Sequence, residues 1–165
     1  MNSKLTVKDA ALLAIMGALM FASQVVMASL PNIHIVALLI ILTTFMFGWK
    51  AMYSVGIFVL LEGLMFGFGP WWIGYTYAWP LLVILTLIFR ANTSPLFWAV
   101  LAALHGLFFG ALCAITQIFI LGGKGALAWW INGIPFDLLH GAGNFVLVLV
   151  LIKPLRKLTE KLMNG

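Results

Sequence analysis

The chain has 165 residues, of which 64% are hydrophobic and only 8% are charged, and its mean hydropathy is +1.15. So apolar a composition excludes a soluble globular domain and predicts an integral membrane protein, because about 20 apolar residues in a helix cross about 30 Å of hydrocarbon. The single cysteine, Cys113, excludes a disulfide framework and a cysteine-based metal site.

Apolar runs divide the sequence into six predicted membrane spans. They cover residues 9–30, 33–49, 51–69, 72–89, 95–121 and 135–153, with short connections between them and one longer predicted loop at Gly122–Gly133. The expected fold class is therefore an all-α membrane protein, a compact bundle of six transmembrane helices that occupies residues 1–165 as a single domain.

The cations indicate how this bundle is oriented in a membrane. Lys4 and Lys8 precede the first span, Lys50 and Arg90 lie in connections, and the other cations on this side follow the sixth span at Lys153, Arg156, Lys157 and Lys161. Only Lys124 falls on the opposite side. Because cytoplasmic segments are enriched in lysine and arginine, we expect a multi-pass protein of the cell membrane with both termini cytoplasmic. The net charge of +5 is then an orientation signal and does not predict nucleic-acid binding.

The first span carries alanine at every fourth position. Ala10, Ala14, Ala18 and Ala22 form one stripe along the helix. Small side chains let another helix approach closely in lipid, so the stripe predicts a helix-docking surface. Similar series of small residues occur in the third and fifth spans. Two such stripes could close the bundle internally and leave a third for a separate protein, and the sequence leaves open which one is spare.

Spans two to four supply candidate binding residues toward the end expected to face outward. His34 opens the second span, Glu62 lies past the midpoint of the third, and Tyr75 opens the fourth. Glu62 also has a structural interpretation, as the buried partner of a histidine. Aromatic residues surround the turn between the third and fourth spans, which is typical of a bilayer interface and also of a surface that stacks on a ligand.

Spans five and six supply the remaining candidates. Gln117 lies in the outer part of the fifth span, and Trp129 and Trp130 lie in or beside the loop that follows it. Asp137, His140 and Asn144 begin the sixth span at spacings i, i+3 and i+7, which places them on one helical face. Asp137 also has a structural interpretation, because a carboxylate in the first turn of a helix is favoured by free N–H groups and the macrodipole.

Together with Gln24 in the first span, these polar residues come from all six spans and share one depth. Polar groups are costly in lipid and normally face protein or a water-filled cavity. Their common depth therefore predicts a shared cavity that opens outward and holds a small solute.

No catalytic or nucleotide-binding motif accompanies this predicted cavity. Gly122–Gly125 is not a phosphate-binding loop, because it lacks the upstream glycine and the serine or threonine after Lys124. A nucleophile elbow and an HExxH motif are also missing from the sequence. We therefore do not expect an enzyme, a cofactor or a resident metal, and the chain has no sequence motif for ATP hydrolysis.

The six spans, the alanine series and the pattern PFDLLHGAGN…KPL at residues 135–155 resemble the substrate-binding S components of energy-coupling factor (ECF) vitamin transporters. In that family an alanine motif docks against a transmembrane T component that carries two ATPase subunits. The resemblance implies this docking role for Ala10, Ala14 and Ala18, with Ala22 as an extension. It also implies ligand capture near extracellular loops and the outer ends of the later helices, which implicates Glu62, Tyr75, Gln117, Trp129, Trp130, Asp137, His140 and Asn144.

The expected function is capture of a vitamin or related micronutrient, either a B-vitamin-like ring compound or cobalamin, for ATP-driven uptake. Two alternatives stay open. The first is an autonomous proton-coupled carrier or channel that uses Glu62 with His105 or His140. The second is an intramembrane enzyme or metal-binding protein that uses Asp137, His140, His34 and Glu62, whose oxygen and nitrogen atoms could hold a divalent ion.

Overall fold

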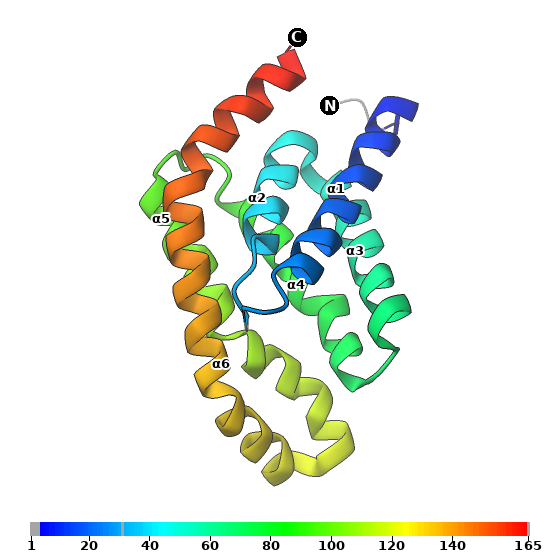
Figure 1. The fold of residues 1–165 in the computed structure, drawn as a ribbon, viewed down its shortest axis with the longest axis vertical. Helices are drawn as coiled ribbons and strands as arrows, with labels where there is room; N and C mark the ends of the chain where they lie inside the picture. Colours follow the sequence, from blue (N-terminus) through cyan, green and yellow to red (C-terminus); the bar gives the residue numbers. More distant parts are fainter. Residues whose placement is uncertain (1–3, 31, 165) are drawn as a thin grey trace.

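The computed structural model of the protein describes residues 4–30 and 32–164, and the regular structure in these residues is entirely helical. The elements in chain order are α1 (Val7–Val26), α2 (Val36–Phe47), the 3-10 helix η1 (Gly48–Lys50), α3 (Ala51–Phe66), α4 (Pro70–Ile88), α5 (Pro95–Leu107) and α6 (Phe109–Asn164) (Figure 1). The predicted all-helical class is confirmed. Four stretches are long and apolar enough to cross a membrane, which indicates a membrane protein: Val7–Val26, Val36–Phe66, Pro70–Ile88 and Pro95–Lys161.

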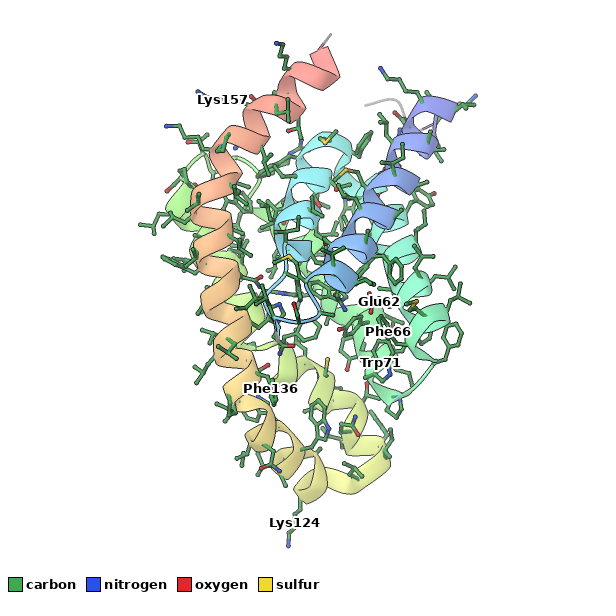
Figure 2. All side chains as sticks on the ribbon, in the orientation of Figure 1. Glu62, Phe66, Trp71, Lys124, Phe136 and Lys157 are labelled. Carbon is green, nitrogen blue, oxygen red and sulfur yellow. The ribbon has the colours of Figure 1, made fainter. Side chains whose placement is uncertain are left out.

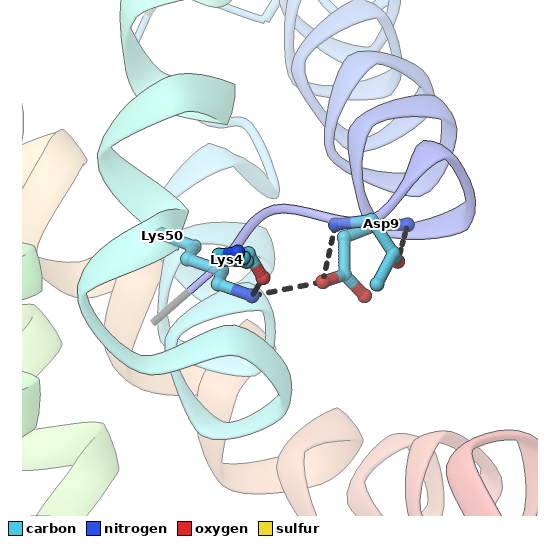
Figure 3. A network of polar contacts seen from close by, with 4 residues as sticks. Lys4, Asp9 and Lys50 are labelled. Atoms are coloured by element: carbon cyan, nitrogen blue, oxygen red, sulfur yellow. Dashed lines mark hydrogen bonds and ion pairs between the residues drawn. The ribbon is translucent and has the colours of Figure 1, made fainter. Parts of the chain in front are cut away.

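The start of α1 is fixed by local hydrogen bonds and by one ion pair. Thr6 Oγ1 accepts a hydrogen bond from the Asp9 backbone N–H at 3.1 Å, and Asp9 Oδ2 accepts one from the Thr6 N–H at 3.3 Å. This capping box satisfies N–H groups that have no partner within the helix. Asp9 Oδ2 also lies 2.8 Å from Lys50 Nζ, which donates to the Lys4 carbonyl oxygen at 3.0 Å (Figure 3). The start of α1 is thereby tied to η1.

The cationic segments lie at one end of the molecule. Figure 1 shows the start of α1, η1, the α4–α5 connection and the end of α6 at the same end of the bundle. Lys157 lies at this end and Lys124 at the opposite one (Figure 2). We refer to the end with Lys157 as the cationic end.

The core is built around α2, which is apolar on all sides. Only Phe45 and Met46 of this helix are not fully buried. Its two threonines are accommodated because Thr43 Oγ1 and Thr44 Oγ1 donate to the Leu39 and Ile40 carbonyl oxygens one turn earlier, at 2.6 and 2.7 Å. A helix that is hydrophobic around its whole circumference belongs in the centre of a bundle.

The inner face of α1 packs on α3 and leaves the alanine stripe outside. Gly17 is buried so closely that an added Cβ would lie 2.7 Å from the Ser54 carbonyl oxygen, and Ser54 Oγ donates to the Leu13 carbonyl oxygen at 2.8 Å. The opposite face carries the stripe, all of whose members are exposed: Ala10, Ala14, Ala18 and Ala22.

The small residues of α5 are covered, unlike the alanine stripe of α1, because they pack against α6. A Cβ at Gly106 would lie 2.8 Å from the Gly141 nitrogen, so the two helix backbones touch. Asn144 Nδ2 donates across the contact to the Ala102 carbonyl oxygen at 3.1 Å. The small residues of the predicted fifth span therefore help to close the bundle internally. This is one of the two roles that the sequence allowed for such a stripe, the other being contact with a separate protein.

The prediction of a loop at Gly122–Gly133 is wrong. Within α6 only Gly122 leaves the helical conformation, with φ 69° and ψ 169°, and the helix resumes at once. A positive φ is tolerated by glycine, so one residue is enough to reverse the chain. The second arm, residues 123–164, is about 60 Å long at 1.5 Å per residue, and the predicted sixth span is only its middle.

Two other predicted boundaries differ from the structure. The fifth predicted span is interrupted at Phe108, where α5 ends and the first arm of α6 begins. His34 does not open a helix, because α2 begins at Val36 and residues 27–35 connect it to α1. This longer connection lets His34 turn into the bundle, where it contacts α4 and α6.

Candidate functional site

A cavity of about 360 Å³ lies between the end of α1, the α1–α2 connection, α3 and α4. This volume is in the lower part of the range of small-molecule sites, roughly 300–1,000 Å³. Figure 2 shows Glu62, Phe66 and Trp71 close together between the ends of the bundle marked by Lys157 and Lys124. The cavity is lined by Gln24, Ala28, Leu30, Asn32, His34, Glu62, Phe66, Trp71 and Tyr75.

One wall of the cavity is formed by a buried carboxylate and an amide. Glu62 is 1% exposed, and its Oε2 accepts a hydrogen bond from Gln24 Nε2 at 3.0 Å. Glu62 Oε1 and Gln24 Oε1 are buried and have no hydrogen-bond partner among the described residues. Buried acceptors are normally paired, and leaving one unpaired costs about 1–3 kcal/mol. This wall is therefore suited to a ligand that donates hydrogen bonds.

Another part of the cavity lining is aromatic. Trp71 and Tyr75 lie one turn apart in α4, so they share a helical face, and their rings meet edge to face at 5.2 Å between centroids. Phe66, at the end of α3, is 52% exposed. Such rings offer flat apolar faces to another ring and a negative π-surface to a cation.

Behind the cavity, the three histidines of the chain gather around Trp79. The His34 ring lies 5.9 Å from Trp79 and 4.9 Å from His140, and the His105 ring lies 5.4 Å from Trp79. His105 Nε2 is 2.9 Å from the Ala78 carbonyl oxygen. His34 Nδ1, His105 Nδ1, His140 Nε2 and Trp79 Nε1 are buried without a partner in the described part of the chain. No set of three or more metal-ligating side chains is found within residues 4–30 and 32–164.

The structure brings four of the residues predicted to share a cavity into one lining, namely Gln24, His34, Glu62 and Tyr75. His140 does not line it but contacts His34 from behind. Asn32 also lines the cavity, although we did not predict it as a binding residue from the sequence. It has φ 56° and its Nδ2 donates to the Phe136 carbonyl oxygen at 3.2 Å. The available signal was the Pro31-Asn32 pair, which lies in the short connection between the first and second predicted spans.

Asp137 and Asn144 do not line the cavity. Asn144 lies in the contact between α6 and α5, whereas Asp137 faces the first arm of α6. Asp137 Oδ1 accepts a hydrogen bond from the Gly110 N–H at 2.9 Å, in the first turn of the first arm of α6. A carboxylate at a helix start is one of the two interpretations that the sequence allowed, although the helix start it satisfies is not that of the predicted sixth span. Three further candidates, Gln117, Trp129 and Trp130, also lie outside the cavity lining.

Comparison with known proteins gave no matching family model, no similar curated protein and no similar solved structure.

Proposed function

We propose that this chain is the substrate-capturing S component of an ECF-type importer and binds a B-vitamin-like ring compound from outside for ATP-driven uptake. One observation carries the proposal. Two buried acceptors without partners among the described residues, Glu62 Oε1 and Gln24 Oε1, share a cavity of about 360 Å³ with the aromatic rings of Trp71 and Tyr75.

The chemistry of the cavity favours a ring that bears N–H donors or a positive charge. A donor on the ligand would satisfy the two oxygens, and a charged donor would form the stronger bond to the Glu62 carboxylate. The rings of Trp71 and Tyr75 would stack on a flat or cationic group. Cobalamin is much larger than a single heterocycle, so the volume favours the ring compound over the corrinoid.

An outward-facing cavity is supported by its distance from the cationic end. The positive-inside bias assigns that end to the cytoplasm, which gives six crossings if the chain turns back at Gly48–Lys50 and at Gly122. Gln24 lies roughly 25 Å along α1 from Val7 at 1.5 Å per residue, so the cavity is near the far side of the hydrocarbon.

The exposed alanine stripe supports docking to a T component that carries two ATPase subunits. The α5 series is occupied by α6, whereas Ala10, Ala14, Ala18 and Ala22 contact no element of this chain closely enough to be buried. Smooth helix faces associate in lipid through close packing. Of these two stripes, the one on α1 is therefore spare, and it lies on the face opposite to Leu13, Gly17 and Met20.

Reconstitution of the purified chain in vesicles tests the proposal. We expect the chain alone to bind its substrate without nucleotide and to accumulate none of it under an imposed proton gradient. Accumulation should require added T component and ATPases. Concentrative uptake by the chain alone would favour the proton-coupled carrier, for which the buried Glu62 and the neighbouring histidines supply titratable groups.

A further inference from the structure

A second cavity, of about 370 Å³, lies at the cationic end, between the start of α5 and the C-terminal part of α6. None of its lining residues belongs to the substrate cavity, and the proposed function makes no use of it. It is lined by Thr93, Pro95, Trp98, Ile152, Lys153, Arg156, Lys157 and Glu160.

The cavity is amphiphilic, with an apolar floor and a cationic rim. Pro95, Trp98 and Ile152 form the floor. Trp98 and Ile152 are only 1% and 2% exposed, so the apolar surface open to a ligand comes from the half-buried Pro95 and the aliphatic stems of Lys153 and Lys157. Lys153, Arg156 and Lys157 form the rim, and their i, i+3, i+4 spacing places all three on one face of α6. One carboxylate, that of Glu160, faces these three cations, so the rim keeps a net positive charge.

The arginine of the rim is held in place by two contacts. Its guanidinium carbon lies 4.6 Å from the centre of the Phe45 ring, and Arg156 Nε donates to Glu160 Oε1 at 3.0 Å. The terminal N–H groups of Arg156 are not used by this ion pair, which engages only Nε. A planar guanidinium fixed in this way is suited to a phosphate, whose oxygens match its fork of donors.

The position of the rim along α6 matches the headgroup layer of a bilayer. Lys124 and Lys153 are separated by about 44 Å of helix at 1.5 Å per residue. A bilayer including its headgroups is about 40–45 Å thick. If Lys124 lies at one surface, then Lys153 lies at the other, with the apolar floor reaching toward the hydrocarbon.

We propose that this cavity binds one anionic phospholipid. The phosphate is held by Lys153, Arg156 and Lys157, and an acyl chain lies over Pro95 and the aliphatic stems of the lysines, above the buried Trp98 and Ile152. A soluble phosphate compound would satisfy the cations but would leave Pro95 and the aliphatic stems of the lysines in water, so a lipid matches both parts of the cavity. Basic pockets between membrane helices on the cytoplasmic side commonly bind such headgroups.

Native mass spectrometry of the full chain in detergent, titrated with phosphatidylglycerol, tests this site. We expect one tightly held phosphatidylglycerol and weaker binding of phosphatidylcholine with the same acyl chains. The double variant Lys153→Gln/Lys157→Gln should bind phosphatidylglycerol about thirtyfold more weakly, since each cation near the surface contributes about fivefold. Glu160→Gln should bind it more tightly, because the variant removes the carboxylate that competes for Arg156.

The matched control is Lys4→Gln/Lys8→Gln, which removes the same charge from the same end of the molecule but outside the cavity. Its affinity for phosphatidylglycerol should equal that of the wild type. An equal loss in both double variants would show a diffuse charge effect and overturn the site. Equal binding of the two lipids would also overturn it. Displacement of phosphatidylglycerol by glycerol phosphate, at the concentration at which the lipid itself binds, would overturn the lipid proposal. It would show that the cavity binds a soluble phosphate compound.

Discussion

Replacing Glu62 by glutamine keeps the shape of the side chain and removes its charge. The wild-type carboxylate is 1% exposed, with one oxygen paired to Gln24 Nε2 at 3.0 Å and the other unpaired. A hydrogen bond to a charged group contributes about 1.5–3 kcal/mol, so Glu62→Gln should weaken substrate binding by roughly 10- to 150-fold. The same change removes a buried ionisable group and keeps an oxygen that can accept from Gln24 Nε2, so the melting temperature without substrate should stay the same or rise.

The assay combines thermal melts with binding isotherms in detergent. Candidate substrates are screened first by the shift in melting temperature that they cause, beginning with thiamine, pyridoxine and cobalamin. Glu160→Gln is the matched control for affinity, because it removes the same charge at an exposed position outside the substrate cavity. Unchanged affinity in Glu62→Gln would refute our assignment of the polar wall. Loss of both folding and binding would instead make Glu62 a structural residue.

Three further predictions concern the helix contacts. Ala14→Trp should leave the melting temperature and substrate affinity unchanged while abolishing uptake by the assembled transporter, because Ala14 is exposed; joint loss of folding and binding would contradict the docking surface. Gly106→Ala should destabilise the bundle by about 1–3 kcal/mol in a denaturation assay, because the new Cβ would lie 2.8 Å from the Gly141 backbone nitrogen, and an unchanged stability would argue against this contact. Asp137→Ala should leave the Gly110 N–H unpaired and cost about 1–3 kcal/mol in thermal melts, whereas Asp137→Asn, which keeps an acceptor, should cost less. Equal melting temperatures for these two variants would argue against the capping role.

Hydropathy and charge were sufficient to predict the helical class and the membrane character of the chain. The same signals marked Glu62, His34 and Tyr75, because a polar residue within an apolar run is costly unless it faces protein or a cavity. Depth along a helix can be counted from sequence, and residues far apart in the chain that share a depth, such as Glu62, His34 and Tyr75, line one cavity in the structure.

Rotation of each helix about its axis could not be predicted in the same way. Asp137 and Asn144 share the predicted depth with Glu62, but the second arm of α6 turns Asp137 toward Gly110 in the first arm and Asn144 toward Ala102 in α5, where each has a backbone partner. Which neighbour a helical face meets is decided by packing, here by the close approach of Gly106 to Gly141. The helix beyond Gly122 was missed because several glycines in one segment are typical of a loop, although only one of them departs from helical geometry.

Mass spectrometry of the small molecule that co-purifies with the full chain tests most directly the claim that the cavity holds a compact ring compound. We expect about one equivalent of a nitrogen-containing ring with N–H donors or a positive charge in the wild type. The same compound should be strongly depleted in Glu62→Gln and retained in Glu160→Gln. Recovery of a corrinoid, or of one compound in equal amounts from the wild type and both variants, would contradict this account of the site.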